Sequence, residues 1–464
     1  MRMKQKTIFI DVPCPISMRN VVTGPQSVYR RLKKEGYKVI LLTPPTAADI
    51  VRTSYEADVE PMNINRKLTT AQKLSDFITK HLNLTRMQVL GSKYGLRHNL
   101  AKRTTRSYLH FVRVLIAHTL GRWRWFRLSA APRLHLFAYR TRPFKEVFDR
   151  HMPDLVFVPN MGSAQGEETL RECKRRGVPT FGMVGSWDHP HKRYQSLQTD
   201  KVFVWSNSLK EEMIQLQSYA PENVLVVGAP HFDLFKDPSF IEDKKVFFAR
   251  MGLNPDIKLF TLFSGTGRAP DEGDIVDMLL KWSKDDSLSE PIQVHIRAYP
   301  GDREDHKKFD QFEGMPGVYT DWVVNGKEFG PEPINYFPDE EYMKNVVSLF
   351  YYSAAVVSVY SSASVEASIF MKPSINVGFD GYQERPFEES VKRFVYQSHF
   401  DKLFKTGAVL DTHSPQELHE AIRTILSNPG VNSEGVKKLQ DTVCGVLDGR
   451  ASERIVTHIV EKVS

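Results

Sequence analysis

Short apolar runs alternate with amphipathic stretches along most of the chain, and this alternation predicts strands separated by helices. Residues 7–12 and 37–43 are apolar runs of strand length, and residues 26–35 between them have helical spacing and end at Gly36. Strand, loop, helix and strand in this order are typical of a parallel α/β unit. No GxGxxG sequence follows the first strand, so this half carries no dinucleotide-binding signature.

The alternation continues to the C-terminus and divides the chain into two similar halves. Further strands are expected at residues 155–158, 179–184, 201–205, 224–227, 259–263, 292–297, 354–360, 374–378 and 408–410. Further helices are expected at residues 144–151, 167–176, 208–216, 339–352, 365–371, 386–400, 415–426, 436–446 and 452–463. Residues 13–24 and 302–330 have no clear period, and we expect irregular loops there. The pattern therefore predicts an α/β protein with two parallel sheets.

Residues 68–145 depart from the alternation and form a long basic segment. Its apolar residues follow helical spacing at Tyr108, Phe111, Val112, Leu115, Ile116, Leu120 and Trp123. Trp125 and Phe126 extend this run into an aromatic cluster. No acidic residue lies between Asp76 and Glu146, and the interval holds 15 Lys or Arg residues. The whole chain has a net charge of +8, so without these 15 positive charges the remainder has a net charge of −7.

This uneven charge leaves three interpretations for residues 77–145. The segment is a helical insertion packed on the core with a solvated basic face, a surface for anionic membranes, or a nucleic-acid site. Trp, Phe and Arg together suit the headgroup zone of a membrane. No recognised nucleic-acid module surrounds the segment, and we therefore expect no nucleic-acid partner.

The length of 464 residues exceeds one ordinary hydrophobic core and favours two domains. Hydrophobic residues make up 41% and charged residues 25% of the chain, as in a typical soluble globular protein. Cys14, Cys173 and Cys444 are far apart and indicate neither a disulfide framework nor a CxxC metal site. Because we find no secretory signal and no apolar run of spanning length, we expect a cytoplasmic protein, peripheral to the membrane if the basic segment binds lipid.

Residues 354–378 have the composition of a strand, a serine-rich turn, a short helix and a second strand. Ser361, Ser362 and Ser364 follow the first strand, and hydroxyl oxygens accept the free N–H groups of a first helical turn. A helix N-terminus also carries partial positive charge and suits a phosphate. Glu366 lies one turn into the helix, where its carboxylate can accept hydrogen bonds from a ribose. The residues alone fit either simple helix caps or a phosphate site.

This stretch resembles the nucleotide-binding half of GT-B glycosyltransferases and their relatives, the UDP-N-acetylglucosamine 2-epimerases and the CDP-glycerol glycerophosphotransferases. The resemblance rests on Ser361-Ser362, Glu366-Ala367 and Lys372-Pro373. Residues 448–454 are also similar to the start of the last helix in the glycerophosphotransferase and surface-polysaccharide branch. The resemblance implies a GT-B fold, with two Rossmann-like domains facing a central cleft and a basic helical insertion, about residues 68–145, in the first domain.

The resemblance also implies how the chain is divided. Residues 228–233 resemble the point at which GT-B chains leave the first domain. We therefore expect an acceptor-binding domain of residues 1–230 and a nucleotide-donor-binding domain of residues 231–464, whose last helix crosses back. In GT-B enzymes the loop after the first strand faces the cleft, so Arg19, Asn20 and Thr23 are further candidates.

A second set of phosphate contacts is expected in the nucleotide-binding domain. Gly265, Thr266 and Arg268 follow the strand at residues 259–263, where a glycine lets the backbone approach a ligand and Thr and Arg can contact phosphate. Near the next strand, where glycerophosphotransferases carry a His-Pro pair, this chain has Tyr299-Pro300. The predicted nucleotide and phosphate contacts are Gly265, Thr266, Arg268, Arg297, Ser361, Ser362, Ser364 and Glu366.

The loop after the strand at residues 179–184 places a carboxylate beside an imidazole. Asp188 and His189 lie at a strand's carboxyl end, where ligands bind in open α/β sheets. We predict Asp188, and after it His189, as the base that deprotonates an acceptor hydroxyl. A metal held by Asp188, His189 and His191 is an alternative, but no further ligand is indicated. GT-B enzymes generally need no bound metal, so we expect no metal and no cofactor besides the nucleotide-activated donor.

The expected function is a glycosyltransferase that moves a sugar from a nucleotide-activated donor to a surface-glycan or lipid-linked acceptor, in polysaccharide biosynthesis for the cell envelope. A CDP-glycerol-type glycerophosphotransferase and a UDP-N-acetylglucosamine 2-epimerase-like isomerase are the enzymatic alternatives. A non-catalytic glycan- or lipid-binding protein of the same fold is the third class. The basic aromatic segment argues against the isomerase, because a soluble epimerase of small molecules has no use for such a surface.

Overall fold

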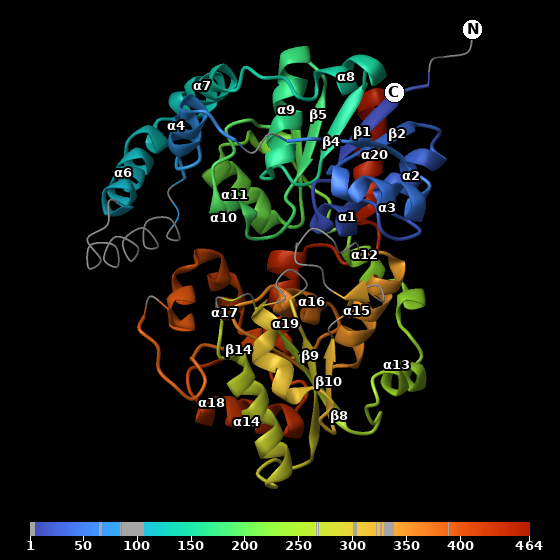
Figure 1. Ribbon diagram of the computed structural model, residues 1–464, viewed down its shortest axis with the longest axis vertical. Coiled ribbons are helices and arrows are strands. Elements are labelled where there is room, and N and C mark those ends of the chain that lie inside the picture. The colour runs from blue at the N-terminus through green and yellow to red at the C-terminus, as the bar shows by residue number, and fades with distance from the viewer. Residues whose placement is uncertain are drawn as a thin grey trace. The chain divides into compact units, whose positions relative to one another are not determined.

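The computed structural model describes residues 5–64, 67–83, 85, 106–265, 267, 269–299, 304–321, 323–324, 327–328, 338–387 and 389–464. By internal packing the chain forms two compact units. The first unit comprises residues 1–233, 396–399 and 448–464, and the second comprises residues 234–395 and 400–447. Each unit is built on its own parallel sheet, which confirms the predicted α/β class (Figure 1).

The first unit contains a seven-stranded sheet in the order β3-β2-β1-β4-β5-β6-β7, and all neighbouring strands are parallel. Its strands are β1 (Thr7–Asp11), β2 (Lys38–Thr43), β3 (Asp58–Pro61), β4 (Leu155–Val158), β5 (Thr180–Met183), β6 (Lys201–Val204) and β7 (Val224–Val226). The chain runs outward from β1 to β3 and then continues on the other side of β1 with β4. The carboxyl ends of β1 and β4 therefore form the topological switch point.

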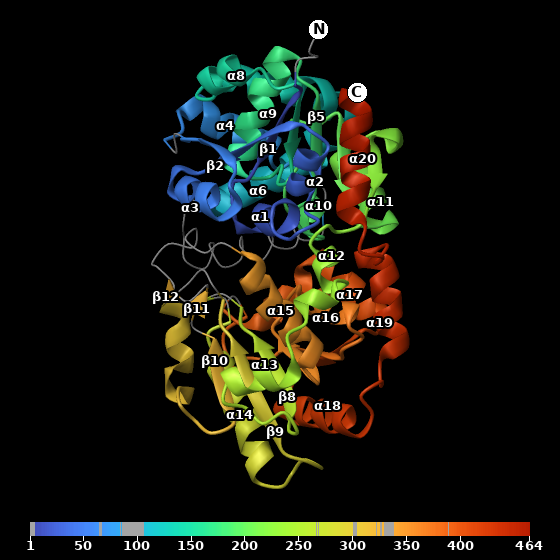
Figure 2. The same cartoon turned by 90° about the vertical axis from the view of Figure 1, so that its right-hand side faces the viewer.

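Helices lie on both faces of this sheet (Figures 1 and 2). They are α1 (Pro15–Val21), α2 (Val28–Lys34), α3 (Pro45–Tyr55), α4 (Thr70–Thr79), α6 (Arg106–His118), α7 (Ala131–Ala138), α8 (Lys145–His151), α9 (Ala164–Arg176), α10 (His189–Lys192), α11 (Asn207–Gln217) and α20 (Ala451–Val463), with the short turns η1 (Leu120–Arg122), η2 (Phe126–Ala130) and η3 (Pro221–Asn223). The irregular loop expected at residues 13–24 is wrong, because α1 lies there. Pro15 is the first residue of α1, a position where the missing N–H of proline costs nothing.

The last helix of the chain, α20, belongs to the first unit and packs beside α2 (Figure 2). The carboxylate of Asp233 accepts the N–H groups of Ala451, over 3.0 Å, and of Ser452, over 2.8 Å, at the start of this helix. Nε of Arg454 donates to the carbonyl oxygen of Val227 over 2.8 Å. The final residues of the chain therefore complete the fold of the unit that contains its first residues.

The basic segment of the first unit is described from residue 106 onward and at residues 67–83 and 85. Its helices α4, α6 and α7 lie together at one side of the unit (Figure 1). An apolar cluster of Leu82, Ile116, Ala131 and Tyr194 joins these helices to the body of the unit. None of the described helices is long and apolar enough to cross a membrane.

The second unit contains a six-stranded sheet in the order β10-β9-β8-β13-β14-β15, again with all neighbours parallel. Its strands are β8 (Lys258–Phe263), β9 (Ile292–Arg297), β10 (Val318–Asp321), β13 (Ala355–Ser358), β14 (Ser374–Val377) and β15 (Val409–Thr412), and a small antiparallel pair is formed by β11 (Val323–Val324) and β12 (Lys327–Glu328). The switch point lies between β8 and β13. The irregular segment expected at residues 302–330 is wrong where β10 forms the edge strand, a four-residue element inside a charged stretch.

Helices also cover this second sheet (Figures 1 and 2). They are α13 (Lys244–Arg250), α14 (Glu272–Lys284), α15 (Glu340–Tyr352), α16 (Ala363–Ile369), α17 (Asp401–Thr406), α18 (Pro415–Ser427) and α19 (Ser433–Leu439), with α12 (Phe232–Phe235) at the start of the unit and the turns η4 (Pro238–Phe240), η5 (Glu304–Phe312), η6 (Val391–Tyr396), η7 (Ser398–Phe400) and η8 (Gln440–Cys444). The helix expected at residues 386–400 is wrong, because only the short turns η6 and η7 form. The carboxylate of Asp380 accepts the N–H of Val391 over 2.8 Å and fixes the chain in this shape.

Candidate functional site

The predicted nucleotide contacts of the second unit lie at the carboxyl edge of its sheet. Phe263, the last residue of β8, pairs with Arg297 of β9 on one side and with Ser358 of β13 on the other. The N–H of Ser264 donates to the carbonyl oxygen of Arg297 over 3.0 Å. The turns after β8 and β13 therefore begin side by side at the switch point, where open α/β sheets bind ligands.

The turn after β8 is held by a buried carboxylate that sequence reasoning did not select. The N–H of Gly265 donates to Oε1 of Glu272 and the hydroxyl of Ser264 donates to Oε2, each over 2.8 Å. Nζ of Lys308 lies 2.8 Å from the same Oε2. Burial raises the pKa of Glu272, while Lys308 and these hydrogen bonds act to lower it. The Gly265 N–H is thus used inside the protein, and a Cβ at this position would meet Glu272 only at 3.5 Å.

Arg297 is buried, and its guanidinium forms an ion pair with the carboxylate of Asp321 in β10. It also lies over the ring of Tyr342, 4.9 Å from the ring centroid. Nη2 of Arg297 is buried and has no hydrogen-bond partner within the described part of the chain. Arg297 therefore keeps one buried guanidinium nitrogen without a partner, while Asp321 balances its charge. Thr266 and Arg268, two other predicted contacts, lie outside the described residues.

The turn after β13 opens with a backbone conformation that residues other than glycine rarely adopt. Tyr360 has φ of 44°, in the left-handed region, which typically costs about 1–3 kcal/mol. Its N–H donates to Oδ1 of Asn376 over 2.7 Å, and Nδ2 of Asn376 donates to Asp411 over 2.7 Å. Strands β14 and β15 thus fix the shape of the serine turn.

The serines of this turn differ in what their hydroxyls do. Oγ of Ser361 accepts the N–H of Ala363 over 3.2 Å, which is the capping role predicted for this turn. The side chain of Ser362 is exposed and makes no capping hydrogen bond. Ser364 and Glu366 are buried in α16. Ser362 is therefore the serine whose side chain faces solvent at the switch point.

The predicted base residues of the first unit lie after β5, at the carboxyl edge of the first sheet. Oδ2 of Asp188 lies 2.5 Å from Nζ of Lys192, while Oδ1 is buried and has no hydrogen-bond partner among the residues described. Burial opposes ionisation of Asp188, but Lys192, His189 and His399 outweigh it and hold its pKa well below the ordinary range. Burial lowers the pKa of His189 to about 4, although Asp188 acts to raise it. At neutral pH the pair is a carboxylate beside a neutral imidazole.

Side chains from α1 and from the turn after β4 lie close to this pair. Nδ2 of Asn20 donates to the carbonyl oxygen of Gly185 over 3.2 Å. A Cβ on Gly185 would lie 3.0 Å from the His189 ring and 3.5 Å from the side chain of Asn160, so only glycine leaves this space open. Nδ2 of Asn160 in turn donates to Sγ of Cys14 over 3.3 Å. The switch point of the first sheet therefore brings Asn20 and Asn160 to the Gly185 turn that precedes His189, and Cys14 to Asn160.

Buried polar atoms without partners are frequent at this edge, although such atoms are rare in folded proteins. Oδ1 of Asn20, Nε1 of Trp205 and both ring nitrogens of His231 have no hydrogen-bond partner in the described structure. His231 and Trp205 pack edge to face with ring centroids 5.3 Å apart. Burial, followed by the charge of Arg19, holds the pKa of His231 well below its ordinary value. Sequence reasoning missed His231 and Trp205, because each follows a different strand.

Asp11, the last residue of β1, is a second carboxyl group that sequence reasoning missed. It is fully buried, and its Oδ1 accepts hydrogen bonds from Gln165, over 3.0 Å, and Thr169, over 2.9 Å. Burial raises the pKa of Asp11 to about 7, against these two hydrogen bonds. Both partners belong to α9, so Asp11 faces the helix layer. In the sequence, Asp11 was marked only by its place at the end of an apolar strand.

The metal alternative for Asp188, His189 and His191 finds no support in the geometry. Nε2 of His191 lies 3.0 Å from Oε1 of Glu212, and Nδ1 lies 3.0 Å from Oγ of Ser398. His191 is thus engaged with two residues of other segments, while Asp188 is engaged with Lys192. Among the described residues, the possible ligand atoms of these three side chains do not all lie within 4.8 Å of one another.

A different group, Asp76, His135 and Glu167, does bring its donor atoms within 4.8 Å of one another. The Nζ of Lys80 already lies among them, 2.9 Å from Asp76 and 3.1 Å from Glu167. Nε2 of His135 contacts a guanidinium nitrogen of Arg171 at 2.7 Å. A lysine ammonium therefore occupies the position of a cation, and the group ties α4 and α7 to α9.

Comparison with known structures identifies the fold, whereas comparison of sequences identifies no family. No family model and no curated protein matches the chain. A UDP-GlcNAc 2-epimerase from Neisseria meningitidis bound to UDP-GlcNAc has a similar structure, with a TM-score of 0.54 and 13% identity over 98% of this chain and 100% of that one. A glycosyltransferase from Rickettsia africae matches with a TM-score of 0.50 and 10% identity over 99% of both chains.

The wall teichoic acid polymerase TagF, in a crystal soaked with CDPG, is similar as well. Its TM-score is 0.50, at 12% identity over 99% of this chain and 88% of that one. These structures are GT-B-type enzymes, and the likeness confirms the predicted GT-B fold with two Rossmann-like units. The fold is thus one that enzymes acting on nucleotide-activated sugars and alditols share.

Proposed function

We propose that this protein is a GT-B glycosyltransferase that moves a sugar from a nucleotide-activated donor to a surface-glycan or lipid-linked acceptor. The observation that carries the proposal is the meeting of the Ser264–Gly265 turn, Arg297 and the Ser361–Ser362 turn at the switch point of the second sheet. Similar structures hold UDP or UDP-GlcNAc, which supports a nucleotide-sugar donor for a chain of this fold.

In this proposal the second unit binds the nucleotide. The exposed hydroxyl of Ser362 and the buried Nη2 of Arg297 are the donors for the phosphates, because both lie at the carboxyl edge and neither has a hydrogen-bond partner among the described residues. Thr266 and Arg268 complete the phosphate contacts, and Glu366 receives the ribose. Fixed donors of this kind stabilise the charge that develops on the leaving nucleotide, and this electrostatic effect usually dominates such reactions. We propose that no metal is needed for this step.

The first unit supplies the base in this proposal. His189 is neutral at physiological pH, so its imidazole can accept the proton of an acceptor hydroxyl as the oxygen attacks the sugar. Asp188, our first choice from the sequence, is ionised but paired with Lys192, and a carboxylate with so low a pKa is a weak base. The structure therefore favours His189 as the base, with Asp188 as the group that orients it.

The acceptor end of the proposal rests on an exposed surface of the basic segment. We call it the basic aromatic surface, and its apolar members are Leu109, Phe111, Val112, Leu115, Trp123, Trp125 and Phe137. Its basic members are Arg122, Arg124, Arg133 and Arg140, which are exposed and have no ion pair within the described residues. Apolar rings among unpaired arginines suit the headgroup zone of an anionic membrane. A lipid-linked acceptor would be met there.

A second candidate function is a UDP-N-acetylglucosamine 2-epimerase-like isomerase, because several similar structures have that activity. A CDP-glycerol-type glycerophosphotransferase is the third, through the likeness to the teichoic acid polymerase. The two differ from the glycosyltransferase in a measurable way: an epimerase needs no acceptor, and a glycerophosphotransferase releases CMP.

The test begins with a binding screen of the full chain against UDP, CDP, CMP, GDP and ADP by thermal shift. The sugar nucleotides of the bases that bind are then incubated with the protein in deuterated water, with and without lipid-linked glycan primers. Acceptor-dependent release of nucleoside diphosphate supports the glycosyltransferase. Deuterium at C2 of the sugar without an acceptor shows the epimerase instead. Failure to bind any of the nucleotides would contradict all three enzymes.

A further inference from the structure

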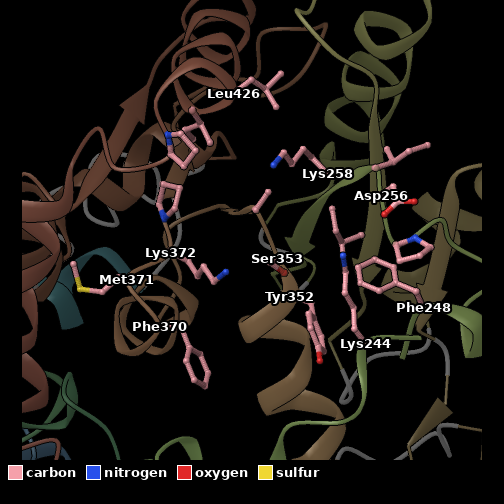
Figure 3. Close-up of a pocket in the computed structure, with 17 residues that line it drawn as sticks. Lys244, Phe248, Asp256, Lys258, Tyr352, Ser353, Phe370, Met371, Lys372 and Leu426 are labelled. Atoms are coloured by element: carbon pink, nitrogen blue, oxygen red, sulfur yellow. The ribbon is translucent and has the colours of Figure 1, made fainter. Parts of the chain in front are cut away.

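The second unit contains a pocket of about 480 Å³ at the edge of its sheet opposite to the proposed nucleotide site (Figure 3). Lys258 is the first residue of β8, Ala354 precedes β13, and Pro373 precedes β14, so the pocket lies at the amino edge of the sheet. The strand ends at the switch point belong to the carboxyl edge. Pockets for small molecules have volumes of about 300–1,000 Å³, so this space is large enough for a ligand of its own.

Apolar side chains form about half of the exposed wall of the pocket, and polar groups form the rest. Phe248, Tyr352 and Phe370 contribute aromatic rings, and Leu259 and Leu426 contribute aliphatic side chains. In Figure 3 the labelled rings stand around the open space rather than filling it. Such walls suit an organic ligand with a flat or aliphatic body more than a bare inorganic ion.

Three lysines border this space. The side chains of Lys244, Lys258 and Lys372 come from three separate segments, and their amino ends turn toward the pocket (Figure 3). None of the three has an ion pair within the described part of the chain, and Asp256 is the carboxylate among the lining residues. Burial, followed by the charge of Lys258, lowers the pKa of Lys372. Like charges thus face each other here without a full set of counter-charges.

A purely structural explanation exists for these lysines. The helices α15 and α16 end at this edge, and a helix C-terminus favours nearby positive charge. That explanation accounts for Lys372, which lies just after α16. It does not account for Lys244, at the first residue of α13, where the helix dipole disfavours a positive charge. It also gives no reason for the pocket between the lysines.

From this geometry we infer a second ligand site in the amino edge of the second unit, for a small phosphorylated molecule with an aromatic or apolar body. The phosphate is bound between Lys244, Lys258 and Lys372, and the body packs against Phe248, Tyr352 and Phe370. The site is separate from the nucleotide site, and the inference does not depend on the proposed transferase activity. It uses Lys372 of the Lys372-Pro373 pair, to which the proposed reaction gives no role.

The experiment measures binding of 1-naphthyl phosphate to the full chain by isothermal titration calorimetry, with inorganic phosphate and 1-naphthol as the two half-ligands. We expect 1-naphthyl phosphate to bind at least tenfold more tightly than either half. The variant K244E/K258E changes two exposed side chains and should weaken this binding at least tenfold. The matched control K281E/K284E makes the same charge change on exposed lysines of α14 and should alter it less than twofold.

Competition separates this site from the nucleotide site. Saturating UDP should leave the affinity for 1-naphthyl phosphate unchanged, and displacement of the probe by UDP would overturn the inference. Equal losses in K244E/K258E and in the control would show a general charge effect and would overturn it as well. If K244E/K258E keeps full affinity, the lysines only serve the helix ends and no such site exists.

Discussion

The backbone N–H of Gly265 donates to the carboxylate of Glu272 over 2.8 Å, and the same carboxylate lies 2.8 Å from Nζ of Lys308. The turn after β8 is therefore fixed by the first residue of α14 rather than by its own glycine. A turn held in this way keeps its shape before a ligand arrives, which limits the ordering that binding requires.

Replacing Glu272 by alanine should destabilise the second unit and loosen this turn. The change removes the buried carboxylate that balances the partly buried Lys308, and removing one partner of a buried pair typically costs about 3–5 kcal/mol. Urea unfolding of the full chain should show this loss, while Glu313→Gln, an exposed carboxylate in the same unit, should stay within about 0.5 kcal/mol. Equal stability of Glu272→Ala and the wild type would mean that the carboxylate does not hold the turn.

Replacing Ser362 by glutamate should weaken nucleotide binding without harm to the fold. Ser362 is exposed, and a carboxylate there would repel the phosphates of a nucleotide at the switch point. We expect at least a tenfold loss of affinity for the nucleotide found in the screen, or about 1.4 kcal/mol. Calorimetry checks it against Ser427→Glu, an exposed serine at the end of α18. A loss of the same size in both variants would remove Ser362 from the site.

Arg297→Ala is a poor test of the same site, because it would leave the buried Asp321 without its partner. The double variant Arg297→Met with Asp321→Asn avoids an unpaired charge. It should lower nucleotide affinity while keeping the unfolding midpoint within a few degrees of the wild type. An unchanged affinity in this folded variant would show that Nη2 of Arg297 contacts no phosphate.

The rate of transfer should fall at acid pH as His189 becomes protonated. Its pKa is lowered to about 4, so the base form is present from neutral pH down to that value. Asp188→Asn removes a charge that raises this pKa and should move the acid limb to lower pH. Initial rates between pH 3.5 and about 8, with circular dichroism to confirm folding, test this. An acid limb near the ordinary histidine value of 6.5, or one that Asp188→Asn does not move, would argue against His189.

Asp11 should make the protein less stable as the pH rises. Its pKa is raised from 3.8 to about 7 in the folded state, so the folded protein binds the proton more tightly than the unfolded chain does. The resulting stability is fully present below about pH 4 and is lost as the pH rises through about 7. Between pH 5 and pH 8 the wild type should lose about 2–3 kcal/mol relative to Asp11→Asn. In urea unfolding, the control Asp49→Asn changes an exposed carboxylate and should lose as much stability between the two pH values as the wild type does. If Asp11→Asn loses the same amount as well, Asp11 is already ionised at both pH values and the prediction is wrong.

The basic aromatic surface should bind anionic vesicles in a salt-sensitive way. Each Lys or Arg near an anionic surface contributes about 1 kcal/mol, and Trp123 and Trp125 add burial at the interface. Flotation with anionic and neutral vesicles at low and high salt tests the binding. Arg122→Glu with Arg124→Glu should abolish it, whereas Lys437→Glu with Lys438→Glu, exposed residues of α19, should not. A protein that never floats with anionic vesicles at low salt would point to a soluble acceptor.

The fold followed from the sequence because it depends on local pattern. Apolar runs became most of the strands of both sheets, although β3 (Asp58–Pro61), which is not apolar, was missed, and the strand order placed the turns after β8 and β13 together. The helix α1 was missed because a proline-rich start resembles a loop, although proline suits the first position of a helix. The short edge strand β10 was missed because four residues inside a charged stretch carry almost no periodic signal.

The candidate site followed only in part, because its contacts join distant residues. The sequence indicated Arg297 and Gly265 as phosphate contacts, but not that Asp321 and Glu272 already engage them. Those partners lie 24 and 7 positions away and are set by strand register and helix placement. His231 likewise looked like a linker residue until the folded chain placed it against Trp205. Burial and pairing, which decide the chemistry of each group, are properties of the assembled unit.

The position of α20 reverses the order in which the two units can be completed during synthesis. A ribosome releases β1 to β7 first, but the apolar face of α20, with Ile455, Ile459 and Val463, leaves it only after the whole second unit. The second unit contains nothing beyond residue 447, so its own sheet and helices are all available before that point. Until residues 448–464 have left the ribosome, Asp233 has no helix to cap and the surface beside α2 stays bare. The half of the protein that is made first is therefore finished last, and a nascent chain stalled before residue 448 would present that bare surface to chaperones.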